Sequence, residues 1–139
     1  MTDQPQKPKR PERLFSIEEA NNLIPDFTRW FSEIQVLRQT IVNIVESKNK
    51  ISRGNGNILS DIVQNQQDLV ATSNAVERIS ELIESINKTG AEFRDLDGGM
   101  IDFLHLRNGR KVYLCWTMGE EKIGFWREIE SDATGRQPL

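Results

Sequence analysis

The sequence predicts an α+β protein: a long antiparallel helical hairpin, similar to a coiled coil, followed by a small antiparallel β-meander. Two observations favour this class. From Phe27 to about Lys88, apolar residues recur every three or four positions, the spacing of helices that bury one face. Beyond Gly90 the pattern becomes alternating, and six of the ten aromatic residues lie between Phe93 and Trp126, as is typical of strands.

The composition is that of a single domain without a membrane segment. The chain has 139 residues, 37% of them hydrophobic and 28% charged, with a net charge of -3. It lacks the ~18 consecutive apolar residues of a membrane span and the apolar segment of a signal peptide. A lone cysteine, Cys115, suits a reducing compartment, so we expect a cytoplasmic protein. The slight negative charge argues against a dedicated nucleic-acid binder.

Residues 1–13 predict a disordered, basic, proline-rich arm. They hold three of the five prolines and no large apolar residue after Met1, so they cannot join a packed core. We expect the folded part to be a single domain, 14–139, made of a helical hairpin (14–89), an antiparallel sheet (91–130) and a C-terminal tail (131–139).

The first helix is expected to begin with a capping box. The Ser16 hydroxyl can accept a hydrogen bond from the Glu19 amide, while the Glu19 carboxylate accepts one from the Ser16 amide. Pro25 lacks the amide that a helix interior needs and disfavours helical geometry at Ile24. We therefore expect a short first helix, with Pro25 in the first turn of the next one.

A heptad pattern of apolar residues then predicts a helix with one apolar seam. A second, looser pattern recurs at Ile62, Leu69, Val76 and Ile83, and a polar loop at residues 53–57 joins the two helices into a hairpin. Two explanations for the spare apolar surface stay open: it lies on the sheet, or it pairs with a second copy. The residues that we nominate for self-association are Trp30, Ile34, Leu37, Ile41 and Ile44.

The pair Asn108-Gly109 predicts a two-residue hairpin turn of type I′, because both central positions of that turn need positive φ. The turn fixes the register and pairs Asp102 with Cys115. One face of this hairpin then carries Ile101, Phe103, His105, Val112, Leu114 and Trp116, and the other carries Asp102, Leu104, Tyr113 and Cys115.

A third strand is expected after a four-residue turn at 118–121. This register puts Phe125 beside Leu114 on the first face and Trp126 beside Tyr113 on the second. The helices can cover only the first face. The C-terminal tail, another subunit or a ligand should therefore cover part of the second face.

The best candidate binding site is a cross-strand row on the second face. Asp102 and Cys115 pair there, and Gly124 is expected beside them, which leaves a gap next to Tyr113. A carboxylate in this place is either clamped by an arginine, for which Arg136 is the nominated partner, or functional. The candidate ligand-binding residues are Asp102, Tyr113, Cys115, Glu128 and Arg136.

No established catalytic motif occurs in the sequence, and we lean away from an enzyme. Cys115 is a weak candidate nucleophile because His105, its one candidate base, is expected on the opposite face. Asp95 and Asp97 with Asp102 could hold a hard cation, but their spacing matches no calcium loop and a turn explains them. We assign no catalytic residue, metal site or cofactor.

Four segments resemble a known bacterial family, the one catalogued as domain of unknown function 2203. The resemblance covers residues 14–139 and implies no activity. The family usually has a histidine where this chain has Arg127. The resemblance therefore does not imply, for this chain, a reaction that depends on that histidine. The segments that carry the resemblance are FSIEEANNLIP (15–25), GGMIDF (98–103), GRKVYLCWTMGE (109–120) and GRQPL (135–139).

The sequence therefore favours an interaction or assembly module that self-associates, as a dimer, without contact with membrane or nucleic acid. The alternative is a protein that binds a small ligand or metal, or an enzyme, with its site at the Asp102 row. An unidentified protein partner is compatible with either hypothesis.

Overall fold

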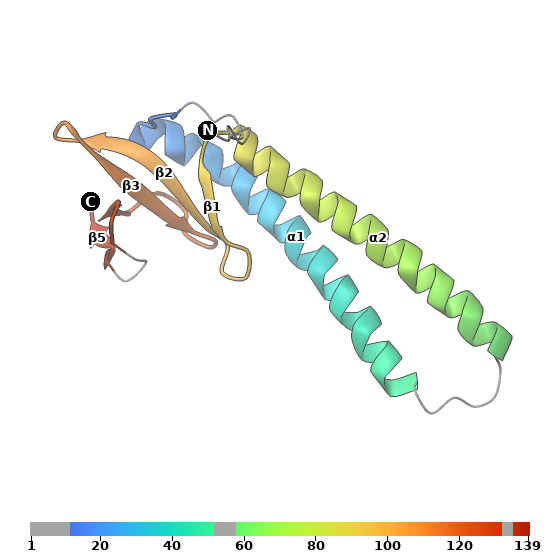
Figure 1. Ribbon diagram of the computed structural model, residues 1–139. Helices are drawn as coiled ribbons and strands as arrows, with labels where there is room; N and C mark the ends of the chain where they lie inside the picture. The colour runs from blue at the N-terminus through green and yellow to red at the C-terminus, as the bar shows by residue number, and fades with distance from the viewer. Residues whose placement is uncertain (1–11, 52–57, 132–134) are drawn as a thin grey trace, which may run out of the picture. The chain divides into compact units, whose positions relative to one another are not determined.

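The computed structural model describes residues 12–51, 58–131 and 135–139, and contains two helices followed by a five-stranded antiparallel sheet (Figure 1). This confirms the predicted α+β class. Each strand neighbours the next one in sequence, so the sheet is a meander. The elements are α1 (Ile17–Ile51), α2 (Ile58–Lys88), β1 (Glu92–Asp95), β2 (Met100–Arg107), β3 (Arg110–Thr117), β4 (Phe125–Glu128) and β5 (Gln137–Pro138).

The chain divides into two compact units. The sheet unit comprises Met1–Thr28 and Ile86–Leu139, and the hairpin unit comprises Arg29–Ser85. The predicted loop at 53–57 and most of the predicted arm lie outside the described residues. Neither helix contains, in its described part, a stretch long and apolar enough to cross a membrane.

The capping box at the start of α1 is confirmed. The Glu19 amide donates to the Ser16 hydroxyl over 3.0 Å, and the Ser16 amide donates to the Glu19 carboxylate over 3.1 Å. The expected break at Pro25 is wrong, because α1 continues through it. Pro25 is exposed, while Ile24 and Phe27 on either side of it are buried. Burial of both neighbours favours one continuous helix over the backbone hydrogen bond that proline removes.

In the hairpin unit, α1 and α2 run side by side (Figure 1). An exposed ion pair links them: the Arg78 guanidinium donates from Nε to Glu33 Oε2 over 2.5 Å and from a second nitrogen to Oε1 over 3.1 Å. Ile34 on α1 and Ala75 on α2 are buried, whereas Leu37 is half-buried. The α1 pattern therefore does place apolar residues inside the hairpin unit.

The apolar residues that were predicted to form the seam of α2 are exposed instead of buried. Ile62, Leu69 and Val76 are exposed, and the buried residues of this helix in the hairpin unit are Ala75 and Leu82. Both sets recur every seven residues, about two helical turns, so each set lies on one face of the helix. The larger aliphatic side chains gave the outward set the stronger sequence signal, whereas the inward set depends on a small alanine.

The hairpin of β2 and β3 has the predicted register in every pair. Asp102 lies opposite Cys115 and Arg107 opposite Arg110. The φ values of Asn108 and Gly109 are 52° and 79°, the positive values that the predicted turn requires.

The core of the sheet unit lies on the first face of the β2–β3 hairpin, against the beginning of α1. The Phe27 ring is 5.6 Å from the Phe103 ring and 6.1 Å from the Trp116 ring. The Phe15 ring meets Phe103 edge-on at 5.1 Å, and the Phe15 amide donates to the Leu104 carbonyl over 2.7 Å. Aromatic rings from both ends of the sequence thus close one core.

The predicted register of the third strand is wrong by one residue. In the structure Trp126 lies opposite Leu114 and Arg127 opposite Tyr113. The connection from β3 to β4 spans residues 118–124, which is longer than the expected turn. Because side chains alternate across a sheet, the slip moves Trp126 to the first face and Arg127 to the second.

Candidate functional site

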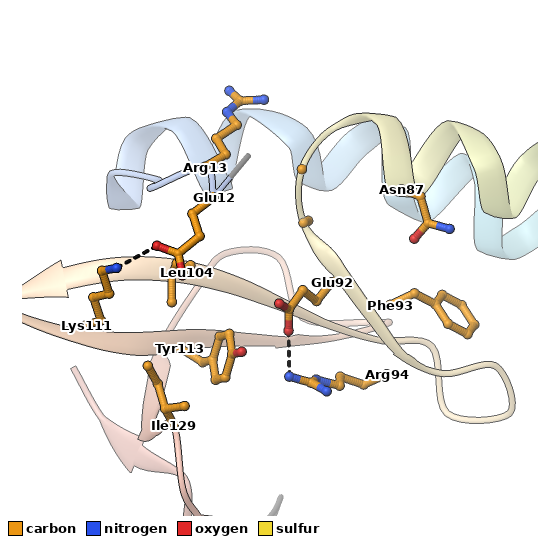
Figure 2. A pocket seen from close by; sticks show the side chains of 12 residues that line it. Glu12, Arg13, Asn87, Glu92, Phe93, Arg94, Leu104, Lys111, Tyr113 and Ile129 are labelled. Atoms are coloured by element: carbon orange, nitrogen blue, oxygen red, sulfur yellow. Dashed lines mark hydrogen bonds and ion pairs between the residues drawn. The ribbon is translucent and has the colours of Figure 1, made fainter. Parts of the chain in front are cut away.

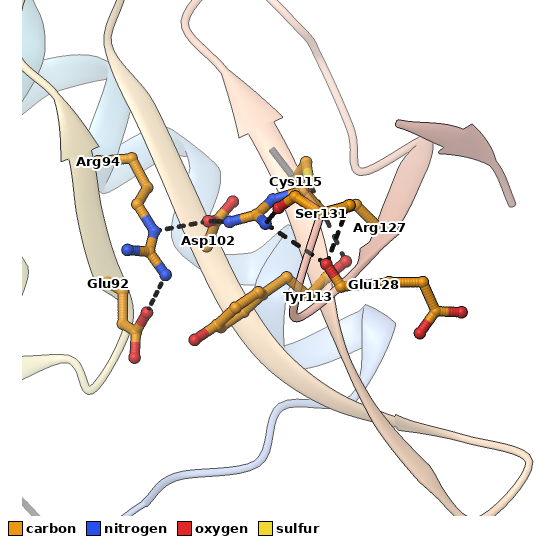
Figure 3. Close-up of polar contacts among 8 residues, drawn as sticks. All are labelled: Glu92, Arg94, Asp102, Tyr113, Cys115, Arg127, Glu128 and Ser131. Carbon is orange, nitrogen blue, oxygen red and sulfur yellow. Dashed lines mark hydrogen bonds and ion pairs between the residues drawn. The ribbon is translucent and has the colours of Figure 1, made fainter. Parts of the chain in front are cut away.

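Three charged residues meet on the second face of the sheet, and we call Arg94, Asp102 and Arg127 the arginine clamp (Figure 3). Asp102 Oδ2 accepts a hydrogen bond from Arg94 Nε over 2.7 Å and another from the Arg127 guanidinium. Asp102 and Arg127 are buried, while Arg94 is exposed and also binds the Glu92 carboxylate over 2.6 Å. One buried carboxylate thus joins strands β1, β2 and β4.

Tyr113 of β3 completes this cluster. The Arg94 and Arg127 guanidinium carbons lie 5.1 and 4.8 Å from the centre of its ring. Burial raises the pKa of Tyr113, and the neighbouring Glu92 carboxylate raises it further. A neutral phenol ring under two cations stabilises their placement through cation–π attraction.

Cys115 is buried beside Asp102 and cannot act as a ready nucleophile. Burial raises its pKa to about 11, and the Asp102 charge adds to this shift. His105 lies on the other face, as its register pair Val112 shows, and its Nδ1 is 2.6 Å from the Phe15 carbonyl oxygen. The thiol therefore stays protonated near neutral pH and has no imidazole base beside it.

The remaining two predicted ligand-binding residues do not contact the Asp102 carboxylate, although the Arg136 guanidinium donates to the Cys115 carbonyl over 3.5 Å. Glu128 pairs with Arg110, and Figure 3 shows its side chain pointing away from the clamp. Arg136 binds the Glu120 carboxylate over 2.9 and 3.1 Å, and its guanidinium lies 4.2 Å from the centre of the Phe125 ring. The tail does fold back, because β5 pairs with β4. Its arginine, however, is not the partner of the buried carboxylate.

Asp102 and Cys115 are paired, with Tyr113 on the same face, as the sequence indicated. The predicted place of Gly124 is wrong, because Phe125 lies opposite Cys115, and the two arginines were missed. Arg127 was missed because the slipped register had placed it on the other face. Arg94 was missed because the sequence did not predict the register of β1, which is irregular between Phe93 and Asp95.

A hollow of about 560 Å³ opens on this side of the sheet unit (Figure 2). Its lining includes Tyr113 and the cations Lys111 and Arg94. Lys111 already binds the Glu12 carboxylate over 2.5 Å, and Arg94 binds Glu92. The hollow therefore presents paired charges, and a charged ligand would have to displace a protein carboxylate.

The acidic cluster considered for a cation is explained by a turn. Asp95 accepts hydrogen bonds from the Asp97 and Gly98 amides, both over 3.1 Å. Asp102 is bound to arginines instead. In the described part of the chain no three metal-ligating side chains gather into a possible ion site.

A second candidate site is the outward face of α2 in the hairpin unit. At ~100° per residue, this face lies opposite the buried Ala75 and Leu82. From Ile58 to Val76 it carries no charge, and past Val76 it carries Glu77 and other acidic residues. We call its exposed apolar residues, with Gln66 and Ser73 between them, the outer stripe: Ile58, Leu59, Ile62, Val63, Leu69, Val70 and Val76.

The residues nominated for self-association are on α1, not on the outer stripe. Ile34 is buried, and the other four are half-buried: Trp30, Leu37, Ile41 and Ile44.

The model of one protein family matches residues 13–139, and its description is "Uncharacterized conserved protein (DUF2203)". The chain therefore belongs to that family. No curated protein and no solved structure matches the chain.

Proposed function

We propose that this DUF2203 protein is an assembly module that forms a homodimer through the outer stripe of α2. The observation that supports it is the exposure of the stripe: its seven apolar side chains are 49–75% exposed. Single exposed aliphatic residues are ordinary, but a contiguous row of them on one helix face marks an interaction surface.

The area of the outer stripe suits a stable interface. Seven aliphatic side chains at this exposure leave on the order of 700 Å² of apolar surface per copy, and a standard interface buries about 800 Å² per partner.

The charge pattern favours a second copy as the occupant. A two-fold symmetric interface brings the same patch of both subunits together, so a charged patch would repel itself. The outer stripe is uncharged from Ile58 to Val76, and acidic residues begin only at Glu77. A basic partner helix would instead require acidic side chains along the stripe.

The arginine clamp supports a structural role for the sheet unit in this proposal. Asp102 satisfies two arginines at once, and the protonated Cys115 thiol offers no nucleophile. A reduced, buried thiol agrees with the bacterial cytoplasm as the compartment. The sheet unit then acts as a stable body attached to a dimerising hairpin.

A second candidate function, binding of a small anionic ligand, is favoured by the hollow of about 560 Å³. That volume is in the range of small-molecule sites, and Lys111 could exchange its bond to Glu12 for a ligand carboxylate. Native mass spectrometry of the purified chain distinguishes the candidates. We expect a dimer without added mass. A monomer with a defined adduct that Lys111→Ala removes would favour the ligand.

The direct test is Leu69→Asp, which places a carboxylate in the middle of the outer stripe. Its matched control is Asn74→Asp, which puts the same charge on a neighbouring exposed position outside the stripe. Sedimentation equilibrium should show a dimer for wild type and control, and at least ~100-fold weaker association for Leu69→Asp, because the variant brings two carboxylates together in an apolar interface. Both variants should keep the wild-type circular dichroism spectrum. A wild type that is monomeric at about 100 µM would overturn the proposal.

A further inference from the structure

The outer stripe has an internal order of layers. Six of its positions advance by alternating steps of three and four, as the two core positions of a heptad repeat do. Two of the six are polar but uncharged, and they lie between apolar ones. In chain order these positions are Leu59, Ile62, Gln66, Leu69, Ser73 and Val76.

We propose that the two copies pair their α2 helices parallel and in register, so that each layer meets its own copy. This inference rests on the proposed dimer and adds the orientation of its partner. Leu69 then packs against Leu69 of the second copy, and Gln66 meets Gln66. Two facing glutamine amides can hydrogen-bond to each other, and two facing serine hydroxyls at Ser73 can do the same.

Antiparallel pairing mixes these layers. The six positions form two alternating sets, and in an antiparallel pair each set faces the other set. The sets are Leu59, Gln66 and Ser73, and Ile62, Leu69 and Val76. With the stripes overlapping fully, Ile62 would face Ser73 and Gln66 would face Leu69, twice each. Each glutamine amide would be buried against an aliphatic side chain without a partner, which is unfavourable for a buried polar group. The polar layers therefore favour the parallel register, as single polar core residues do in coiled coils.

The flanks of the stripe are compatible with this register. Parallel pairing brings Ile58 next to Val63 of the second copy and Thr72 next to Glu77, so no two like charges meet. The parallel alignment of two α2 dipoles is unfavourable by itself. In each hairpin unit, however, α1 runs antiparallel to α2 and its dipole opposes that of α2 (Figure 1).

Disulfide trapping distinguishes parallel from antiparallel pairing of the two α2 helices. A disulfide needs Cα atoms within about 7 Å, so it forms only between residues that face each other. The Ser73→Cys variant tests parallel pairing, and an equal mixture of the Ile62→Cys and Ser73→Cys variants tests antiparallel pairing. The Asn74→Cys variant is the control for random collision. The wild type controls for the native thiol, because Cys115 is buried.

We expect Ser73→Cys to form covalent dimers at least about tenfold faster than Asn74→Cys, and the mixture to yield no 62–73 product. A dominant 62–73 disulfide in the mixture would overturn the parallel register while leaving the dimer intact. A dimer by sedimentation that gives neither product would also overturn it. A monomeric wild type would overturn the proposed function, and the register with it.

Discussion

Replacing Asp102 by asparagine tests whether the arginine clamp is structural. The substitution keeps the shape of the side chain but removes the charge that binds Arg127, whose side chain is 10% exposed. Removing one partner of a buried ion pair costs about 3–5 kcal/mol, because the other charge stays buried without its counter-ion. Arg127 keeps its hydrogen bonds to the Glu128 and Ser131 carbonyls, which favours the lower end of this range. The loss at Arg94 adds little, because that side chain is 41% exposed and keeps its bond to Glu92.

We therefore expect Asp102→Asn to lower the free energy of unfolding by about 3 kcal/mol. The measurement is urea unfolding followed by tryptophan fluorescence, because Trp116 and Trp126 both lie in the sheet unit. The control Glu92→Gln removes an exposed partner of the same cluster and should cost less than about 1 kcal/mol.

A double-mutant cycle makes the test specific for the pair. Adding Arg127→Gln to Asp102→Asn removes the stranded charge, so the double variant should be less destabilised than the sum of the single variants by at least ~1 kcal/mol. If Asp102→Asn costs less than about 1 kcal/mol and the two effects are additive, the clamp is not structural. That result would favour the alternative in which Asp102 binds a ligand.

Three local features of the sheet unit give further tests. Gly90→Ala should lose at least about 1 kcal/mol of stability by thermal unfolding, because φ is +92° and the new Cβ would lie 3.0 Å from Arg13, whereas Gly124→Ala, with open space around it, should change little. Ser16→Ala should lose about 1 kcal/mol in urea unfolding by breaking the capping box, and no loss would contradict that role. With its pKa at about 11 against 9.0 for the free group, Cys115 should resist iodoacetamide at pH 8 until the chain unfolds. Its contribution to stability is complete below pH 9 and is lost as the pH rises toward 11, because the unfolded thiol ionises first; fast labelling of the native protein would refute this.

Features that depend on a few adjacent residues could be predicted from the sequence. The capping box at Ser16 needs only its own four residues, and the Asn108-Gly109 turn fixes both its backbone and the pairing of the strands beside it. That pairing already placed Asp102 next to Cys115 in one row. A tight turn leaves a single register, so no tertiary information was needed.

Features for which the local sequence is compatible with two different structures could not be predicted. The connection at 118–124 is compatible with two registers of β4 that differ by one residue. The register decides whether Trp126 or Arg127 lies opposite Tyr113. Pro25 can end a helix or lie within one on its exposed side, and the burial of its neighbours decided between the two.

The sequence by itself determined the α+β class, the helical hairpin, and the β2–β3 hairpin with Asp102, Tyr113 and Cys115 on one face, because periodicity and turn chemistry are local properties of the chain. Only the tertiary structure decided which partners the buried carboxylate has and which face of α2 is exposed. Both depend on which of two equally spaced sets of side chains is buried. That choice depends on packing between segments distant in sequence, where a small residue such as Ala75 can fit better than a larger aliphatic one.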